Sequence, residues 1–316
     1  MASVLVVGSL NMDLVAQVKE PLVMGRTVTA EGFAMVPGGK GANQAVAAAR
    51  LGARVSLVGR VGTDAFVRTL LQSVGEAGVK SEGILQDDAA STGLALITVT
   101  LTAENTIVVI PGANRRLSPA DIDNLLPLMS AAQVLLLQME IPMETVIQAA
   151  RQAKGMGKRV ILDPSPARPL PDSLSGLVDI ITPNETEAEV LTGHPIGGLQ
   201  DAKLAASELL SRGFARVIMK LGAQGSLLGQ PSAAEECATG PGWDLKLFPA
   251  FPVKAVDTTA AGDAFNAALA VALAEGRSLP EAVAFANAAG ALATTIPGAQ
   301  PSLPHRQEVE ALLVKS

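Results

Sequence analysis

The sequence has 316 residues, of which 48% are hydrophobic and 17% charged, and its formal net charge is −6. This composition is typical of a folded enzyme with a large core and excludes a disordered chain. No run of Lys and Arg with interleaved aromatic residues is present, so we expect no nucleic acid partner. The single Cys237, with only His194 and His305, leaves too little material for a disulfide framework, a Cys/His zinc site or Ser-His catalysis.

The amino terminus runs directly into an apolar segment without a basic region before it. No uncharged apolar stretch reaches the roughly 18 residues that a membrane-spanning helix needs. We therefore expect a cytosolic protein that does not enter a membrane.

Residues 4–7 form a β-branched and Leu-rich run, which predicts a buried parallel strand. Asn11, Met12 and Asp13 follow shortly after its end. Side chains just beyond the carboxyl end of a central strand lie where open α/β sheets bind ligands. Asn11 and Asp13 could therefore bind sugar hydroxyls, or could simply form an Asx turn.

Two pairs of alternating apolar and polar segments predict a small sheet separate from the main one. The first pair lies within residues 14–35, and the second comprises 93–101 and 106–110, joined by turn-forming residues 102–105. One apolar face of such a sheet needs cover, so we expect a lid over a site, a dimer surface, or both.

Residues 37–44, with the sequence PGGKGANQ, precede an Ala-rich helix that ends near Leu51. The glycines let a ligand pack on the backbone, and Asn43 can both donate and accept hydrogen bonds. This is no Walker A loop, because Gly41 follows Lys40 where Ser or Thr would hold magnesium. Lys40 fits a structural role or a ligand contact better than a phosphate clamp. No G-x-G-x-x-G fingerprint follows a predicted strand, which excludes a Rossmann dinucleotide site.

The middle of the chain alternates strands with helices, which predicts βαβ units and a parallel sheet. The expected strands are 55–58, 134–138, 159–162, 178–182 and 217–221, and the expected helices include 64–74 and 143–154. Glu140 follows the strand 134–138 and so lies on the ligand-bearing edge of the sheet, although it could merely precede the next helix.

The expected strand 178–182 leads into an acidic helix start. Glu185, Glu187 and Glu189 suit magnesium and its water shell, since this ion keeps several waters and few protein ligands. Acidic residues in a first helical turn are also ordinary. After the strand 217–221, a Gly turn leads to a second strand, and this unit could contact phosphates or be a plain hairpin.

The segment 255–266, AVDTTAAGDAFN, is the expected centre of the chemistry. An apolar run at 253–256 predicts a strand, a turn of small residues follows, and 264–274 predicts a buried helix. Free N–H groups and the dipole at a helix start can hold an anion, and the small side chains leave room for phosphate oxygens. Asp263 could accept a proton there, or merely cap the helix.

A further helix is expected at about 279–295, followed by a Gly/Pro loop at 296–302 and a terminal helix. Such a loop can expose carbonyls that coordinate a potassium-sized cation, although most loops of this kind bind nothing. No internal repeat or interdomain linker is present. We expect a single domain, 1–316, with lid strands inserted at about 14–35 and 91–111.

Three motifs taken together resemble the PfkB carbohydrate kinase family: GGKGAN at 38–43, TPNETE at 182–187 and DTTAAGD at 257–263. The resemblance runs from Val4 to about Pro304. It implies a three-layer α/β sandwich with a mostly parallel central sheet of nine or ten strands and a small β lid that also forms a homodimer. It further implies transfer of the ATP γ-phosphoryl group to O5 of D-ribose, with Mg²⁺ and an activating monovalent cation, expected to be K⁺.

The resemblance also implies roles for individual residues. Asp263 would be the general base, beside an anion hole formed by Ala260, Ala261, Gly262 and Asp263. The sugar would be bound by Asn11, Met12, Asp13, Gly39, Lys40, Gly41, Ala42, Asn43 and Glu140. The nucleotide would be bound by Asn184, Lys220, Leu221, Gly222, Ala223, Gln224, Gly225, Gly262 and Asn287, with Glu187 organising magnesium-bound water. The monovalent cation would be held, mostly by carbonyls, at Asp257, Thr259, Ala293, Ile296, Gly298 and Ser302.

The chain departs from the family pattern in places. Ala260 replaces a common Gly and should be tolerated if its backbone conformation suits a Cβ atom. Lys220 stands where Thr is common, which would alter phosphate contacts, and Arg26 replaces a Glu of the lid. Two alternatives stay open: a related kinase acting on 2-deoxyribose, fructose or a nucleoside, and a sugar-binding regulator without catalysis.

Overall fold

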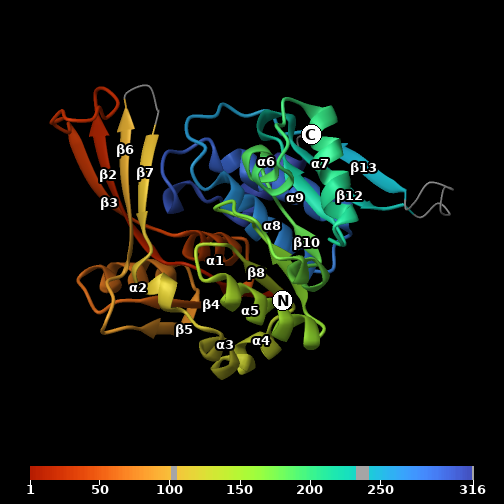
Figure 1. Cartoon of the computed structure of the whole chain (residues 1–316), viewed down its shortest axis with the longest axis horizontal. Helices are drawn as coiled ribbons and strands as arrows, with labels where there is room; N and C mark the ends of the chain where they lie inside the picture. The colour runs from red at the N-terminus through yellow and green to blue at the C-terminus, as the bar shows by residue number, and fades with distance from the viewer. Residues whose placement is uncertain (101–104, 233–241, 315–316) are drawn as a thin grey trace.

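A nine-stranded sheet forms the centre of the molecule, for which a computed structural model describes residues 1–100, 105–232 and 242–314 (Figure 1). The strand order is β13-β12-β11-β10-β9-β8-β1-β4-β5, parallel from β11 to β5 and antiparallel at β12 and β13. The strands are β1 Ser3–Val7, β4 Arg54–Val61, β5 Lys80–Gln86, β8 Val134–Leu137, β9 Arg159–Leu162, β10 Ile180–Ile181, β11 Val217–Lys220, β12 Ser226–Pro231 and β13 Trp243–Phe248.

Helices cover both faces of this sheet and complete the expected three-layer sandwich. Alternate residues of β1 pack into separate cores, Val4 and Val6 on one face and Leu5 and Val7 on the other. The first face is covered by α1 Lys40–Arg50, α2 Phe66–Glu76, α8 Ala261–Ala274, α9 Leu279–Ala293 and α10 Arg306–Val314. The second is covered by α3 Pro119–Asn124, α4 Leu126–Ala131, α5 Met143–Gly155, α6 Glu185–Thr192 and α7 Leu199–Ser211.

Helix α8 is the most deeply buried element of the first layer. Every residue from Asp263 to Ala274 is buried, and most are Ala, Val or Leu. Small side chains let α8 pack closely on α1 and α9, so the start of α8 is fixed relative to both helices.

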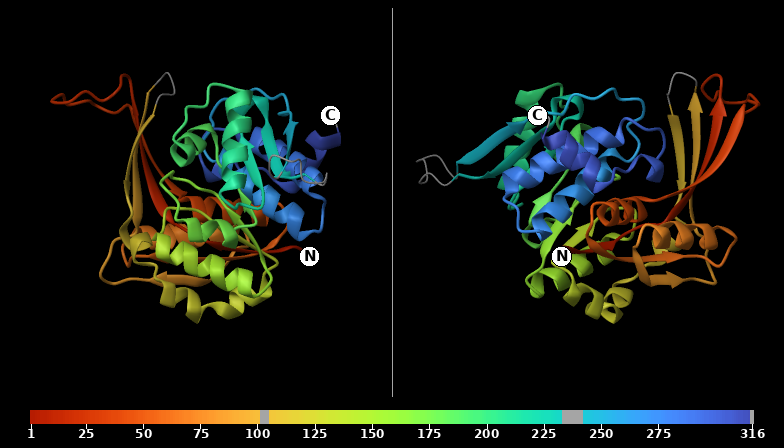
Figure 2. Two further views of the ribbon diagram at one scale, coloured as in Figure 1. Left: turned by 45° about the vertical axis from the view of Figure 1, so that its right-hand side comes forward. Right: turned by 180° about the vertical axis from the view of Figure 1, so that it is seen from behind.

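A second sheet has the order β3-β2-β6-β7 and stands away from the main body in two views (Figure 2). Its strands are β2 Asn11–Val18, β3 Gly32–Gly38, β6 Gly93–Thr100 and β7 Asn105–Ile110. The expected four-stranded lid sheet is confirmed. Residues 102–104 of the expected turn lie outside the described residues, as does Cys237.

Some expected elements differ in the structure. The strand expected at 253–256 is absent: this segment is a loop after Pro252, and the amides of Val256 and Asp257 donate to the carbonyl of Thr294 at the end of α9, not to a strand. The strand expected at 178–182 shortens to β10, because a 3₁₀ helix ends just before it at Leu177 and the chain turns into α6 after it. Within the described residues, no helix combines the length and apolarity needed to span a membrane.

Candidate active site

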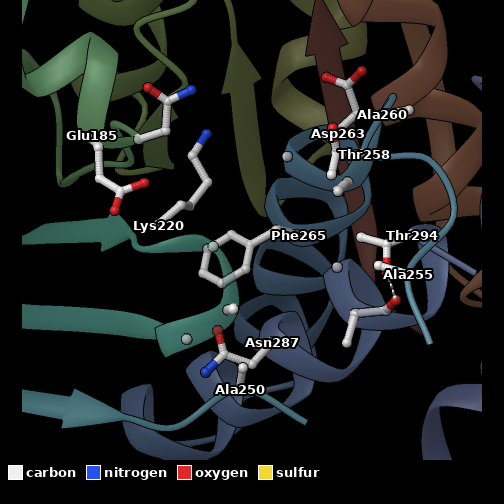
Figure 3. Close-up of a pocket in the computed structure, with 18 of the residues that line it drawn as sticks. Glu185, Lys220, Ala250, Ala255, Thr258, Ala260, Asp263, Phe265, Asn287 and Thr294 are labelled. Atoms are coloured by element: carbon white, nitrogen blue, oxygen red, sulfur yellow. Dashed lines mark hydrogen bonds between the residues drawn. The ribbon is translucent and has the colours of Figure 1, made fainter. Parts of the chain in front are cut away.

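A cavity of about 840 Å³ opens at the carboxyl edge of the main sheet (Figure 3). It lies between the loops that follow β9, β10 and β11, the start of α8 and the carboxyl-terminal half of α9. Phe265 lies in the middle of the view, with Lys220 and Glu185 on one side and Thr294 and Ala255 on the other. The expected site residues that line it are Lys40, Asn184, Glu187, Lys220, Gly222, Ala223, Gly225, Ala260, Ala261, Gly262, Asp263 and Asn287. Leu221 and Gln224 do not line it.

The start of α8 has the geometry of an anion site. Ala260 is the N-cap, and its carbonyl accepts the first intrahelical hydrogen bond from the amide of Ala264 at 2.9 Å. The amides of Gly262 and Asp263 precede this bond and so have no acceptor within the helix. Gly262 and Asp263 also line the cavity, so two free N–H groups lie beside it at the positive end of the helix dipole.

Ala260 adopts a left-handed backbone conformation, with φ of 59° and ψ of 8°. Among the described residues it is the only non-glycine residue with a positive φ. The sequence predicted that alanine would be tolerated here only if the backbone conformation suits a residue with a Cβ atom. The structure does not meet this condition, since the left-handed region is unfavourable for alanine.

Asp263 is buried, and both of its carboxylate oxygens accept hydrogen bonds from α1. Asn43 Nδ2 donates to Oδ2 at 3.0 Å, and Gln44 Nε2 donates to Oδ1 at 2.9 Å. Burial raises the pKa of Asp263 to about 6, against the lowering effect of the Lys40 charge and of the two amides, while the carboxylate of Asp163 raises it further. A carboxylate with this pKa can act as a base near neutral pH.

The expected sugar-binding residues form a connected group beside Asp263, at the junction of the two sheets. Glu140 Oε2 accepts hydrogen bonds from Ser9 Oγ, from the Lys40 amide at 3.1 Å and from Asn11 Nδ2 at 3.5 Å. Glu140 therefore binds the first amide of α1 and does not cap α5. Asn11 Oδ1 in turn accepts from Asn114 Nδ2 at 2.7 Å.

Asp13 lies on β2, and its pKa is raised to about 7 by burial, by Glu140 and by Asp263. The backbone at Gly39 packs directly against β2. The φ angle of Gly39 is 88°, and a Cβ atom at this position would lie 2.7 Å from the Asn11 amide nitrogen. Of the other residues expected at the sugar, Met12 and Ala42 have buried side chains, and Gly41 packs against the backbone of Ser9.

Lys40 carries a firmly held positive charge. Burial alone would lower its pKa, but the carboxylates of Asp263, Asp163, Glu140 and Glu187 together raise it. Because Lys40 lines the cavity, its ammonium group can balance the charge of a phosphate ligand.

The nucleotide side of the cavity is formed by α6 and β11. Asn184 and Glu187 form a capping box, with Glu187 Oε2 accepting from the Asn184 amide at 2.8 Å. Lys220 Nζ donates to Asp163 Oδ1 at 2.9 Å and lies 3.7 Å from Glu187 Oε2. Asn287 Nδ2 donates to the carbonyl of Phe248 at 3.2 Å.

Only part of the expected acidic magnesium group lies at this cavity. Glu185 and Glu187 line it, whereas Glu189 accepts the amide of Ile196 at 2.7 Å and does not line it. In the part of the chain that the structure describes, no group of three or more His, Cys, Asp and Glu could hold a metal ion directly. The two cavity carboxylates still fit Mg²⁺, which often keeps most of its waters and few protein ligands.

The residues expected at the monovalent cation come from two loops that are joined. Asp257 Oδ1 accepts from the amide and hydroxyl of Thr259, and Asp257 Oδ2 accepts from the Gly298 amide at 2.8 Å. Ala293 ends α9, Ile296 lies in the following loop, and Ser302 is buried after it. The structure thus joins Asp257 and Thr259 to Gly298.

Four residues of the site were not predicted from the sequence: Gln44, Asn114, Gln138 and Asp163. Asp163 and Gln138 follow β9 and β8, the same signal that identified Glu140. Gln44 follows Asn43 in the glycine loop motif, and its contact with Asp263 joins residues 219 positions apart. No local pattern indicates such a contact.

Comparison with known proteins gives consistent matches over the whole chain. A family profile described as pfkB family carbohydrate kinase matches residues 1–306. A ribokinase of Haemophilus influenzae is 40% identical over 303 residues, covering 96% of this chain and 95% of the relative. A ribokinase of Bacillus subtilis is also 40% identical, over 313 residues, covering 99% of this chain and 100% of the relative.

Solved structures agree with this similarity. The structure of Arabidopsis thaliana ribokinase complexed with ribose and ATP is 35% identical and superposes with a TM-score of 0.89, covering 99% of both chains. The expected fold is therefore confirmed by neighbours as well as by the sheet topology.

Proposed function

Because the chain belongs to the pfkB family of carbohydrate kinases, we propose that it is an ATP-dependent kinase that phosphorylates D-ribose at O5. The products are D-ribose 5-phosphate and ADP. Near-full-length relatives named ribokinase, and a neighbour solved with ribose and ATP, support this substrate pair.

The observation that carries the proposal is the position of Asp263. Its carboxylate accepts a hydrogen bond from Asn43 in the first turn of α1 on one side, and it lines the cavity beside the free amides of α8 on the other. The proposed base and anion hole therefore lie between the residues proposed to bind the sugar and a cavity large enough for a nucleotide.

In the proposed reaction, Asp263 accepts the proton of the ribose O5 hydroxyl as O5 attacks the γ-phosphorus of ATP. The O5–P bond forms, the bond from the γ-phosphorus to the β-phosphate oxygen breaks, and ADP leaves. The amides of Gly262 and Asp263, with the Lys40 ammonium, stabilise charge on the phosphoryl group. When bound, Mg²⁺ neutralises phosphate charge, and Glu187 with Glu185 would hold its water shell.

Ribose is held by Asn11, Asp13, Asn43 and Glu140 under the small sheet. Closure of this sheet excludes water and so limits hydrolysis of ATP. The nucleotide binds beside Asn184, Lys220 and the 222–225 turn. The joined loops at 257–259 and 296–298 would hold an activating K⁺ ion through carbonyls. The protein acts in the cytoplasm as a homodimer formed through the small sheet.

The direct test is ADP release measured by a coupled assay with and without ribose, in MgATP, with KCl compared against NaCl. We expect ADP release that depends on ribose and is stronger with KCl. A panel with 2-deoxyribose, fructose and nucleosides at equal concentrations tests sugar specificity, and a higher kcat/KM for one of them would overturn the ribose assignment. Calorimetric ribose binding without ADP release would instead indicate a sugar-binding regulator.

A further inference from the structure

Four buried polar side chains, one of which is the proposed base Asp263, form a connected network at the site. Gln44 lies on α1, Asp263 on α8, Gln138 just after β8 and Asp163 just after β9, so four separate elements contribute. Buried polar groups cost free energy unless they are paired, and a network of this kind therefore fixes the geometry of its members.

The amide of Gln44 is shared between two carboxylates. Its Nε2 donates to Asp263 Oδ1 at 2.9 Å and to Asp163 Oδ2 at 2.9 Å. Both hydrogens of one NH₂ group are thus used, one on each carboxylate. Because Asn43 holds the other oxygen of Asp263, two consecutive residues of α1 fix the plane of the carboxylate.

Gln138 determines which way the Gln44 amide faces. Its Nε2 donates to Gln44 Oε1 at 2.6 Å, so the Gln44 oxygen points away from both carboxylates. A rotated amide would place that oxygen against two anions. Gly8 provides the room for Gln138, since a Cβ atom at Gly8 would lie 1.9 Å from Gln138 Oε1.

We propose that Gln44, oriented by Gln138, is a positioning residue that holds Asp263 in line with the acceptor hydroxyl and couples it to the buried carboxylate of Asp163. This inference rests on the proposed kinase function. Gln44 does not touch substrate in this arrangement, and it acts only through Asp263. Neither Asp163 nor Gln138 takes part in the proton transfer itself.

The charges around Asp263 set the expected direction of each change. Lys40 on α1 favours its ionised form, while Asp163 after β9 disfavours it, and Lys220 on β11 partly neutralises Asp163. Asp263 in turn raises the pKa of Asp13 on β2. Glu140, which follows β8, and Glu187, in the first turn of α6, also raise the pKa of Lys40. The Gln44 amide donates to the ionised carboxylate and so favours it. Loss of this donor should make Asp263 harder to ionise, whereas loss of the Asp163 charge should make it easier.

The experiment measures the pH dependence of kcat/KM for ribose at saturating MgATP in Gln44→Met, Gln138→Met and Asp163→Asn, beside the unaltered protein. Gln44→Met should lower kcat/KM by about 10–100-fold and move the acidic limb of the profile to higher pH. Gln138→Met should change both in the same direction but less. Asp163→Asn should move the limb to lower pH.

Gln152→Met serves as the matched control, because Gln152 is a glutamine of α5 that donates to Asp123 far from the site, and its profile should be unchanged. The inference is overturned if Gln44→Met keeps the original limb, whether kcat/KM is unchanged or falls equally at every pH. Should Gln44→Met fail to fold, Gln138→Met decides in the same way. Absence of ribose-dependent ADP release from the unaltered protein would instead contradict the proposed function.

Discussion

Two carboxyl groups at the site have pKa values close to neutrality, about 6 for Asp263 and about 7 for Asp13. Asp263 works as a base only when it is unprotonated, and Asp13 is one of the proposed ribose ligands. We therefore expect kcat/KM for ribose to fall below about pH 7, where Asp13 becomes protonated, and more steeply below about pH 6, where Asp263 does. Two protonations give a limiting slope of about 2 in a plot of log kcat/KM against pH. Steady-state assays between pH 5 and 8.5 measure this. A profile that stays flat down to pH 5 would contradict the assignment of the base.

Replacing Asp263 by Asn keeps the shape of the side chain but removes its basicity. We expect Asp263→Asn to bind ribose while kcat falls by about 10²–10⁴-fold. Calorimetry measures the binding, and the coupled ADP assay measures turnover. Near-normal turnover with an intact thermal transition would remove Asp263 from the role of base.

The left-handed conformation of Ala260 predicts a stabilising substitution. With φ of 59°, this position suits glycine better than alanine. Glycine also increases the entropy of the unfolded chain, which offsets part of the gain. The net effect of Ala260→Gly should be a rise of about 0.5–1 kcal/mol in the free energy of unfolding. Ala261→Gly is the matched control, because Ala261 is the first helical residue of α8 and glycine there should destabilise. Urea unfolding measures both. Equal effects of the two changes would show that the backbone conformation at 260 carries no strain.

At the level of elements, Asp257 joins the loop before α8 to the loop after α9 through the amide of Gly298. Asp257→Ala removes this connection, and the proposed cation site should then lose its geometry. We expect the activation by KCl, measured against NaCl at equal ionic strength, to shrink or disappear. Asp201→Ala is the control, since Asp201 accepts the amide of Gly197 in the same way on α7. Unchanged activation in Asp257→Ala would contradict a cation site between these loops.

The sequence predicted most of the elements that place the site. The β-branched run of β1, the glycine loop before α1 and the buried helix α8 each depend on local periodicity and small residues, so their existence could be predicted. The 253–256 segment has the composition of a strand, but the amides of Val256 and Asp257 bond to the carbonyl of Thr294 at the end of α9, which is a tertiary contact. Gln44 was missed for the same reason, because its role depends on which side chains meet across separate elements. Asp163 follows β9 directly, so its position after a strand could have identified it.

For the whole molecule, the small sheet presents two different faces. The strand register places Phe33, Met35, Leu96 and Val108 on one face, and their side chains are 66%, 60%, 42% and 55% exposed. Asn11 and Asp13 lie on the opposite face, with Ile107. The first face is therefore an apolar surface directed away from the sugar-binding residues, and the proposed homodimer would bury it.

Substitutions at two neighbouring residues of β7 test the two faces separately, because the two side chains point to opposite faces. Val108→Glu places a charge on the apolar face and should shift the protein from dimer to monomer in sedimentation velocity, since an unpaired charge in an apolar interface costs several kcal/mol. Ile107→Glu is the matched control: Ile107 is similarly exposed, at 51%, but its side chain points to the other face. This variant should remain dimeric and instead raise KM for ribose, because the charge lies on the face that carries Asp13. A monomeric unaltered protein, or equal loss of the dimer in both variants, would place the interface elsewhere.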